Sequence, residues 1–317
     1  MHIRNLQPAD LEYFLEICRQ GSIAQATVHL GVTQPALSKA IRRLEAVAGA
    51  RLLDRTARGV SPTEMGLELM KRAGIILSEL EAARSILQEM SGARMGTVSI
   101  GVAPTLNHRF MPDITHLALQ SRPKLHLRIS EGLFHELLPR LLLGELDFIV
   151  SSPSSADTLA PELQCELLGR NSFVACVSAS HPLATHRPIR DEQLLEYAWV
   201  LVSPRGILRV TLDQLFQARG LPLLEPQIET SSTVLSKALI TQQGFIGFLP
   251  LEVFADEERA GTIRRLELPW LHWKRELSLL SRRWRTLTPA AEFVANLIKK
   301  EAPLRLDLGN HDIPSPV

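Results

Sequence analysis

Hydroxyl, amide and cationic side chains follow one another at helical spacing after residue 32 of this 317-residue chain. Residues three or four positions apart share one face of a helix, and the first carboxylate of the stretch is Glu45. Amide and guanidinium groups can read base edges in the major groove of DNA, and cations pair with its phosphates. A solvated helix face is the alternative, although such a face usually mixes both signs of charge. The side chains expected to approach DNA here are Thr33, Gln34, Pro35, Ser38, Lys39, Arg42 and Arg43.

An apolar stripe on the opposite face predicts the helix that carries these groups. Thr33 is the expected N-cap, because its hydroxyl can accept a hydrogen bond from a free amide of the first turn. Pro35 falls in that first turn, where a missing N–H costs nothing. The stripe consists of Leu37, Ile41, Leu44 and Ala48, which recur every three or four residues.

Two shorter helices are expected before this one. Apolar residues on one face of 11–18 predict a first helix, which Gly21 ends. Residues 22–25, SIAQ, match a capping box that begins a second helix over 23–30. A three-residue turn, 31–33, then leads into the basic helix. Two short helices joined by a glycine-containing turn, the second basic outside and apolar inside, indicate a helix-turn-helix.

A basic loop follows and suits the wing of a DNA-binding domain. Residues 50–61 join two leucines to a basic tip that contains a glycine. Residues 33–60 hold six cations against two carboxylates, although the whole chain has a net charge of only +1. A local basic patch on a near-neutral body indicates a separate nucleic-acid-binding module, and a solvated loop is the alternative. The cations expected to approach phosphates are Arg51, Arg55 and Arg58.

A long helix is expected next. Residues 61–64, SPTE, match a second capping box with proline at the first helical position. The helical pattern runs from there to about residue 91, and GARMG at 92–96 is the expected hinge. A helix this long with a narrow apolar stripe needs a partner, so we expect a dimer seam, with packing on its own domain as the alternative. The expected seam residues are Met70, Ala73, Leu77, Leu80 and Leu87.

Repeated β-α-β units account for the rest of the pattern. Short connections between apolar strands and helical stretches predict a parallel α/β sheet. The last residues, 301–317, are polar and contain proline, and are expected to form a loose tail. The predicted strands lie at 98–102, 125–129, 146–150, 163–168, 173–178, 199–202, 245–249 and 275–281, and the predicted helices at 104–120, 134–143, 191–197, 207–217, 232–243 and 289–300.

Small hydroxyl side chains gather at several strand-to-helix junctions. In open α/β sheets ligands bind beyond the carboxyl ends of strands, where helix N–H groups point into a crevice. Such hydroxyls can orient a small polar ligand, whereas any one of them alone can simply cap a helix. Arg205 can add a bidentate contact to a carboxylate or sulfonate, with exposure to solvent as the alternative. The expected ligand-binding residues are Ala103, Pro104, Thr105, Ser130, Ser151, Ser203, Arg205, Thr233 and Phe248.

Residues 6–66 resemble the N-terminal domain of the LysR-type transcriptional regulators, most densely along GSIAQATVHLGVTQPALSKAIRRLEAVAGARLLDRTARGVSPTEMG. Through the order of its elements the resemblance extends to about residue 300. It implies a winged helix-turn-helix, a long dimerising linker helix and a two-lobed effector domain similar to periplasmic binding proteins. The expected bounds are 1–61 for the DNA-binding domain, 62–91 for the linker helix, 92–96 for the hinge, 97–166 with 269–300 for lobe I, 167–268 for lobe II and 301–317 for the tail.

This resemblance implies three partners: double-stranded promoter DNA, a small organic effector held between the lobes, and RNA polymerase. The effector is expected to be anionic or sugar-like, since the PRG loop at 204–206 resembles that of a LysR-type branch with sugar or aromatic sulfonate effectors. The implied assembly is a homotetramer built from dimers, in which the effector domains make the second contact. With neither a signal peptide nor an apolar run of about 18 residues, we expect a cytoplasmic protein without membrane attachment.

Catalytic and metal chemistry find little support in the sequence. It has no G-x-S-x-G, G-x-G-x-x-G or H-x-x-x-H motif, and its three cysteines are far apart. We therefore expect no enzyme, no cofactor and no metal site. One alternative is a DNA-binding module fused to a cofactor-dependent enzyme, such as one that uses pyridoxal phosphate, but no lysine lies in a fitting motif. A second is a solute-binding protein whose N-terminal helices serve only assembly, which the basic face of residues 33–60 disfavours.

Overall fold

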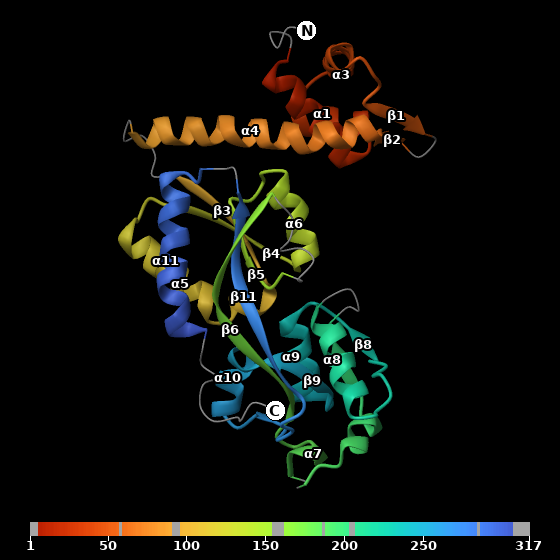
Figure 1. The fold of residues 1–317 in the computed structure, drawn as a ribbon, viewed down its shortest axis with the longest axis vertical. Helices are drawn as coiled ribbons and strands as arrows, with labels where there is room; N and C mark the ends of the chain where they lie inside the picture. Colours follow the sequence, from red (N-terminus) through yellow and green to blue (C-terminus); the bar gives the residue numbers. More distant parts are fainter. Residues whose placement is uncertain are drawn as a thin grey trace.

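Three parts follow one another in the computed structural model, which describes residues 6–56, 59–90, 96–153, 162–185, 188–202, 207–283 and 286–306. A helical N-terminal domain carries a two-stranded wing, and a single long helix leads away from it. A two-lobed α/β region then completes the chain (Figure 1). The winged helix-turn-helix, the linker helix and the two lobes predicted from the sequence are therefore confirmed.

One apolar core holds the three helices and the wing of the N-terminal domain together. Ser22 caps the second helix as predicted, because its Oγ accepts the amide of Gln25 at 3.4 Å. Gly21, Gly31 and Gly49 end the three helices at φ values of +61°, +65° and +69°, which residues with a Cβ rarely adopt. The elements are α1 (Pro8–Gln20), α2 (Ile23–Leu30), α3 (Gln34–Ala48), β1 (Leu53–Thr56) and β2 (Gly59–Pro62).

The predicted capping hydrogen bond of Thr33 is absent from the start of α3. The Thr33 side chain makes no capping bond, and its carbonyl oxygen instead accepts the amides of Ala36 and Leu37 at 3.0 and 3.2 Å. Pro35 lies within the first two helical positions, as expected. The exposed Thr33 hydroxyl is thus left on the outer surface of the domain.

The long helix, α4 (Glu64–Met90), begins later than the SPTE motif predicts. Ser61 and Pro62 belong to the wing, where they pair with β1 in an antiparallel ladder, so they are not available to start a helix. Thr63 is the actual cap, since its Oγ1 accepts the amide of Gly66 at 3.1 Å. The predicted end of the helix, at about residue 91, agrees with the observed end at Met90.

Both lobes are built on one mixed sheet. Its strands lie in the order β4-β3-β5-β11-β6-β9-β7-β8, with β10 paired to β6. Parallel pairs join β3 to β4 and β5, and β7 to β8 and β9, whereas β11 runs antiparallel to both β5 and β6. The parallel pairing predicted from the β-α-β units is therefore present in each lobe, and the long strands β6 and β11 add antiparallel pairs that were not predicted. Lobe I contains β3 (Thr97–Val102), η2 (Pro104–Asn107), α5 (Phe110–Ser121), β4 (His126–Glu131), α6 (Phe134–Leu142), β5 (Phe148–Ser151) and α11 (Pro289–Arg305).

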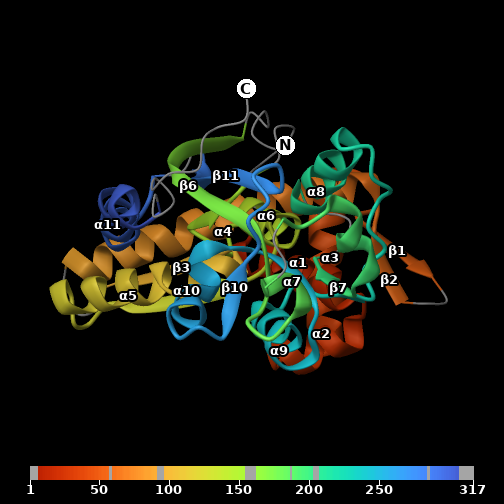
Figure 2. The same ribbon diagram turned by 90° about the horizontal axis from the view of Figure 1, so that it is seen from below.

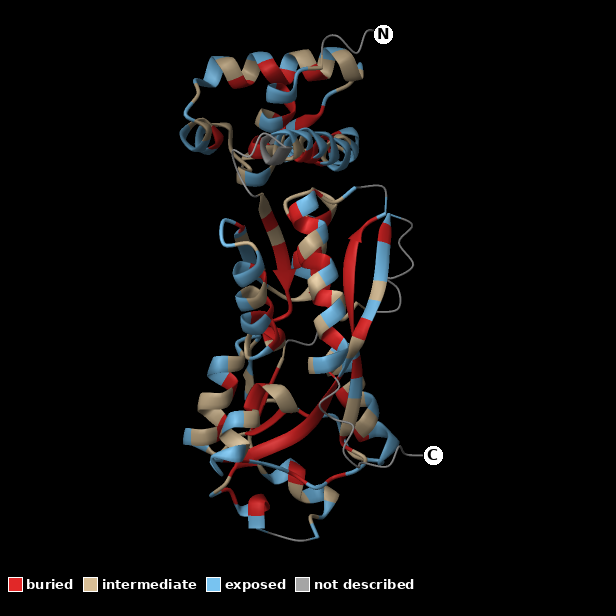
Figure 3. Ribbon diagram, turned by 90° about the vertical axis from the view of Figure 1, so that its left-hand side faces the viewer, coloured by how far each residue is buried: buried red, intermediate tan, exposed pale blue. Residues whose placement is uncertain are grey.

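Lobe II has a separate apolar core, which contains Trp199 and Phe216 in edge-on contact with their ring centroids 6.0 Å apart. Figure 3 shows that burial in both lobes is concentrated in the strands and the inward faces of the helices. Its elements are α7 (Pro182–Thr185), η4 (Asp191–Glu196), β7 (Trp199–Leu201), α8 (Ile207–Ala218), β8 (Ile228–Glu229), α9 (Thr233–Gln243), β9 (Ile246–Pro250), α10 (Leu251–Arg259) and β10 (Ile263–Arg265). Of these, α7, β8, α10 and β10 were not expected, because such short segments show no clear period in the sequence.

Two long strands, β6 (Leu163–Ser178) and β11 (His272–Arg282), pass from one lobe to the other. The sequence predicts two strands, at 163–168 and 173–178, whereas the structure has the single strand β6. The residues between the two predicted strands are extended because they pair with β11. Leu168 and Leu277 belong to the core of lobe I, whereas Phe173 belongs to the core of lobe II. The crossing therefore lies at 169–172 and 274–276, a few residues beyond the boundaries expected at 166 and 269.

The final helix, α11, runs to Arg305 and so continues past its expected end at residue 300. Ala302 is fully buried and Leu306 is 4% exposed, so the last turn packs against lobe I although Pro303 lies within it. The prediction of a loose tail from residue 301 is wrong for its first residues, and 307–317 lie outside the described part of the chain.

The linker helix lies across the end of lobe I in both ribbon views (Figures 1 and 2). Its small residues allow a close approach, since a Cβ on Gly74 would come within 2.4 Å of the carbonyl oxygen of Leu143. Arg282, at the end of β11, donates to the Oγ of Ser78 on α4 at 2.8 Å. Arg19 of α1 pairs with Glu145 of lobe I at 2.5 Å, so the DNA-binding domain and lobe I are in direct contact.

Substituting Gly74 tests this contact. Alanine raises helix propensity, but its methyl group would overlap the Leu143 carbonyl, so we expect Gly74→Ala to lower the free energy of unfolding by about 1–3 kcal/mol or to separate α4 from lobe I. Urea unfolding with small-angle scattering measures both. The exposed change Lys71→Ala on the same helix is the control. An equally stable and equally compact Gly74→Ala protein would contradict the packing described.

Candidate DNA-binding surface and ligand cleft

The outer face of α3 presents most of the groups that the sequence assigned to DNA. Thr33, Gln34, Pro35, Lys39 and Arg42 are exposed, and Ser38 is half-buried. The opposite face places Leu37, Ala40, Ile41 and Leu44 in the core of the domain. Because the core takes up the apolar stripe, the polar and cationic groups must face outward together. Hydrogen-bond donors and cations along a single exposed helix face can contact base edges and phosphates.

Arg43 does not belong to this exposed set. Its Nε donates to Oδ2 of Asp10 at 2.8 Å, and its Nη2 makes a second contact with Oδ1. Asp10 is fully buried on α1, so its charge depends on this fork of two hydrogen bonds. The hydrogen bond to the Asp10 carboxylate also raises the pKa of Arg43. Arg43 therefore holds α3 against α1, whereas the other cations of α3 make no such pair with another helix among the residues that the structure describes.

The wing is anchored to the turn that follows α1. The amide of Val60 donates to the carbonyl oxygen of Gly21 at 2.8 Å. Gly59 has a φ of +128°, and a Cβ there would lie 2.4 Å from the same carbonyl oxygen, so the position requires glycine. Arg51 is exposed before β1 and Arg55 lies within β1, whereas Arg58 falls outside the described residues.

The predicted dimer stripe of α4 divides between two faces. Ala73 is fully buried in the core of its own domain, and Met70 and Leu77 pack against that core. These three residues therefore face the core of their own domain and not the exposed side of α4. Leu80 and Leu87 are 48% and 67% exposed. The apolar stripe that includes them, at helical spacing, consists of exposed Met65, Ile76, Leu80, Ala83 and Leu87 and half-buried Leu69, which also packs against the core.

A cleft lies between the two lobes, with about 980 Å³ of empty space that includes its opening to solvent. Side chains from both lobes line it at the ends of strands and the starts of helices. Of the predicted ligand-binding residues, the structure brings together Ala103, Pro104, Thr105, Ser151 and Thr233. Further hydroxyls that the sequence analysis did not include are Ser152, Thr230, Ser231 and Ser236.

Two predicted ligand residues lie elsewhere, and two cannot be placed. Ser130 lies on β4, where its hydroxyl accepts a hydrogen bond from Nη2 of Arg140 at 3.1 Å, away from the cleft. Phe248 is 3% exposed within the core of lobe II, its ring centroid 5.7 Å from that of Phe173. Neither side chain lines the cleft, because each makes its contacts within its own lobe. Ser203 and Arg205 fall outside the described residues.

Arg275 is the principal cleft residue that the sequence analysis missed. It lies on β11 at the crossing between the lobes and lines the cleft, although it is only 9% exposed. Its Nη2 donates to Oγ1 of Thr105 at 2.9 Å, and its Nε donates to Oδ1 of Asn171 at 3.1 Å. Burial lowers the pKa of Arg275 to about 10, although the charge of Glu252 opposes that shift. An alternating strand pattern cannot reveal that one of its charged residues points inward.

A second hydrogen bond joins the lobes at the cleft. Nε2 of His108, which follows η2 in lobe I, lies 2.7 Å from Oγ1 of Thr233, the first residue of α9 in lobe II. Burial and the charge of Lys237 lower the pKa of His108, which favours the neutral imidazole. Thr105 and Thr233, both predicted to bind ligand, thus each take part in a polar contact at the cleft: Thr105 with the crossing strand β11, and Thr233 with His108 of the other lobe.

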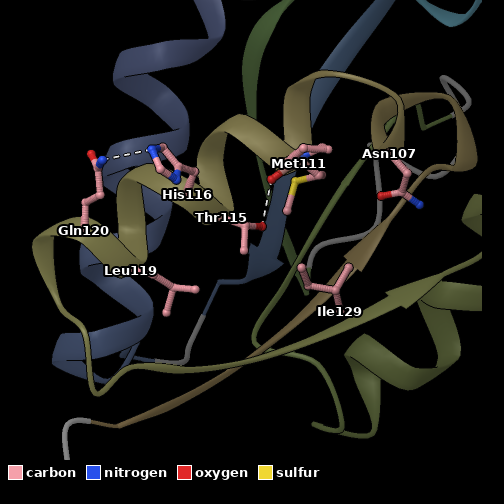
Figure 4. A pocket seen from close by; sticks show the side chains of 8 residues that line it. Asn107, Met111, Thr115, His116, Leu119, Gln120 and Ile129 are labelled. Atoms are coloured by element: carbon pink, nitrogen blue, oxygen red, sulfur yellow. Dashed lines mark hydrogen bonds between the residues drawn. The ribbon is translucent and has the colours of Figure 1, made fainter.

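A groove on the outer face of lobe I lies between α5 and the edge strand β4 (Figure 4). Leu119 and Ile129 point into it from the two elements and are 38% and 41% exposed. The polar side chains beside them bond locally, Thr115 to the carbonyl of Met111 at 2.7 Å and Gln120 to His116 at 2.8 Å. This groove is apolar and open, unlike the hydroxyl-lined cleft between the lobes.

Within the part of the chain that the structure describes, no group of three or more His, Cys, Asp or Glu residues lies in an arrangement that could hold a metal ion. Among the same residues, every helix is too short or too polar to span a bilayer.

Comparison with known families agrees with both halves of this architecture. Residues 8–67 match the model of the bacterial regulatory helix-turn-helix proteins of the lysR family, and residues 91–303 match that of the LysR substrate binding domain. A helix-turn-helix joined to a two-lobed binding domain defines a class of effector-responsive regulators. The chain belongs to the LysR family of transcriptional regulators.

Individual relatives span nearly the whole chain. An uncharacterised HTH-type transcriptional regulator of Escherichia coli K12, YdcI, is 28% identical over 92% of this chain and 95% of its own. The SDS degradation transcriptional activation protein of a Pseudomonas species is 30% identical over 92% of this chain and 95% of its own. Among solved structures, a full-length OxyR variant from Pseudomonas aeruginosa superposes with a TM-score of 0.68 at 18% identity, covering 98% and 99% of the two chains, which shows a shared fold.

The Asp10–Arg43 pair allows a test that separates structure from DNA contact. Arg43→Ala leaves a fully buried carboxylate without its cation, so we expect a clearly lower urea midpoint of unfolding. Arg42→Ala removes the same side chain one position along α3, where it is exposed, and should leave the midpoint unchanged. If the two variants unfold at the same urea concentration, the structural role of Arg43 is refuted.

Proposed function

We propose that the chain regulates transcription by binding promoter DNA through α3 and the wing, in a manner controlled by a small effector in the cleft. The observation that carries this proposal is the outward face of α3, where exposed Gln34, Lys39 and Arg42 adjoin half-buried Ser38. Such a helix, followed by a basic wing, suits insertion into the major groove. Promoter DNA lies in the cytoplasm of a bacterium, where we propose that the protein acts.

Different groups have different tasks in this proposal. Ser38 and Arg42, one helical turn apart, read base edges, because hydroxyl and guanidinium groups fit the donor and acceptor pattern of the major groove. Arg51, Arg55 and Arg58 contact phosphates on either side of the groove, which fixes the register of the domain without reading sequence. The short distance along the chain from α3 to the wing supports a single continuous contact surface.

Binding to the cognate promoter tests the assignment to α3. Arg42→Ala should weaken specific binding by about 1–3 kcal/mol and relax sequence preference, because a base contact is lost. Arg51→Ala should weaken all sequences alike and reduce the slope of log affinity against log salt by about one, because a phosphate contact is lost. Fluorescence anisotropy across a salt series, on cognate and scrambled DNA, distinguishes the two effects. Wild-type affinity and salt slope in both variants would refute the proposed surface.

The exposed stripe of α4 is the proposed dimer seam. Its residues recur at three, four or seven positions, and the faces toward α1 and lobe I are already occupied. A second chain placed along this stripe would bury Ile76, Leu80 and Leu87 together. A tetramer assembled from two such dimers, in contact through their effector domains, is the proposed working form. The open groove between α5 and β4 supports that second contact, because it leaves apolar side chains and a sheet edge uncovered.

A charge introduced at the proposed seam should give a smaller oligomer. Leu80→Glu would place an unpaired carboxylate in each half of the interface, which is strongly unfavourable when buried. We expect sedimentation velocity to show a smaller species with unchanged helical content. Leu67→Glu lies on the opposite side of α4 and is 51% exposed, so it is a matched control that should keep the native assembly. An unchanged size for Leu80→Glu would place the seam elsewhere.

A small organic effector, anionic or sugar-like, is the proposed ligand of the cleft. Hydroxyls from both lobes provide hydrogen bonds, and apolar side chains line the same cleft, as is usual for small-molecule sites. Binding there and not catalysis is the proposed task, since the matching family models describe a regulatory helix-turn-helix and a substrate-binding domain. RNA polymerase is a further proposed partner, because a regulator on a promoter lies beside it.

A further inference from the structure

A buried cation, Arg275, lines the cleft, and none of the carboxylates that the structure describes contacts it directly. The two hydrogen-bond acceptors of the Arg275 guanidinium are the hydroxyl of Thr105 and the side-chain carbonyl of Asn171, and both are neutral. The ring of Phe173 covers one side of the guanidinium, with its Cζ 4.7 Å from the ring centroid. A buried charge is costly unless an opposite charge compensates it, so neutral partners leave this site with a demand for an anion.

Among the described residues, the acidic group of this hydrogen-bond network is Glu252, which Asn171 separates from Arg275. Glu252, in the first turn of α10, accepts a hydrogen bond from Nδ2 of Asn171 at 2.7 Å. The amide of Asn171 therefore separates the carboxylate from the guanidinium, with its carbonyl toward Arg275 and its NH₂ toward Glu252. Burial raises the pKa of Glu252, which weakens its role as a permanent counter-charge.

The rest of the described cleft lining agrees with an anionic ligand. Its only ionisable side chains are Arg275 and His135, and neither Asp nor Glu is among them. Hydroxyls of Ser151, Ser152 and Thr230 offer further donors around the same space. Apolar side chains, including Phe134 and Leu249, cover another part of the wall. The cleft thus offers a cation and an apolar wall, which can contact the acid group and the apolar part of an organic acid.

We infer that Arg275 recognises a carboxylate, or a sulfonate of similar size, on the effector, while the uncharged part of that molecule lies against the apolar wall. This inference rests on the proposed function, in which the cleft is the effector site. The guanidinium is a planar fork that matches an oxyanion in two-point contact. The anion competes with Thr105 for Nη2, and so acts on the hydrogen bond that joins lobe I to the crossing strand β11.

Its position gives that contact a mechanical consequence. Asn171 and Arg275 face each other in the register of β6 and β11, at the point where both strands pass between the lobes. Thr105 belongs to lobe I, and Glu252 belongs to lobe II. An anion bound to Arg275 therefore changes the balance of charge at the crossing itself, where a small rotation of the strands moves one lobe against the other.

A thermal-shift experiment on the full chain tests the inference with three matched pairs of probes. Each pair joins an anion to a neutral compound of similar shape: benzoate with benzamide, benzenesulfonate with benzenesulfonamide, and gluconate with glucose. At least one anion is expected to raise the melting temperature while its neutral counterpart does not. Equal shifts within every pair, or no shift with any anion, would overturn the inference.

Variants then locate the contact. Arg275→Gln should weaken binding of the active anion about 10- to 100-fold in calorimetric titration, the loss expected for one charge-assisted contact. Lys274→Gln removes an exposed cation next to it in the chain and should bind normally. Where Arg275→Gln does not fold, Arg275→Lys keeps the charge but loses the two-point fork, and should still bind several-fold more weakly. Wild-type affinity in a folded Arg275 variant would overturn the inference.

Promoter binding measured in parallel separates this inference from the proposed function. If glucose or another neutral probe binds the cleft and changes DNA affinity, effector control holds and anion recognition by Arg275 fails. If an anion binds through Arg275 but leaves promoter affinity unchanged, anion recognition holds and effector control fails. An anion that binds through Arg275 and changes promoter affinity supports both.

Discussion

The antiparallel ladder between β6 and β11 is the interaction on which the two-lobed region depends. It runs from Leu163 opposite Arg282 to Val174 opposite His272, and its register shifts once, between Leu277 and Ser278. Each lobe adds its own strands to one end of this ladder, so neither lobe can complete its sheet alone. The same ladder must therefore carry any motion between the lobes, and the cleft forms beside the part of it that neither core encloses.

In the DNA-binding domain, the packing of α3 against the core decides which of its side chains face outward. The apolar stripe of α3 is fully used by the core, which forces its polar groups outward. One cation, Arg43, is nevertheless drawn back to Asp10, because a fully buried carboxylate on α1 requires a counter-charge. Adjacent arginines on one helix thus have different tasks, and the difference arises from the partner on another helix and not from their own spacing.

This division explains how far the sequence alone could predict the molecule. Periodicity and end signals predict the helix-turn-helix and the linker helix, because both are local properties of the chain. Contacts between distant segments are not local. The sequence therefore could not show that Arg43 pairs with Asp10 while Arg42 is exposed, or that Ala73 is buried while Leu80 is exposed. In the cleft the loops were found through the rule for strand ends. Arg275 was missed because its neighbours are distant in sequence: the β6–β11 register places it opposite Asn171, and its Nη2 reaches Thr105 in lobe I.

A continuous physical connection runs from the cleft to the DNA-binding domain. Strand β11 carries Arg275 at the cleft floor and, seven residues on, Arg282, which donates to Ser78 of α4 at 2.8 Å. The close approach at Gly144, where a Cβ would lie 2.5 Å from that of Ser78, leaves α4 little room to shift on its own. Because α4 follows directly from the wing, these packed groups connect the strand that lines the cleft to the DNA-binding domain.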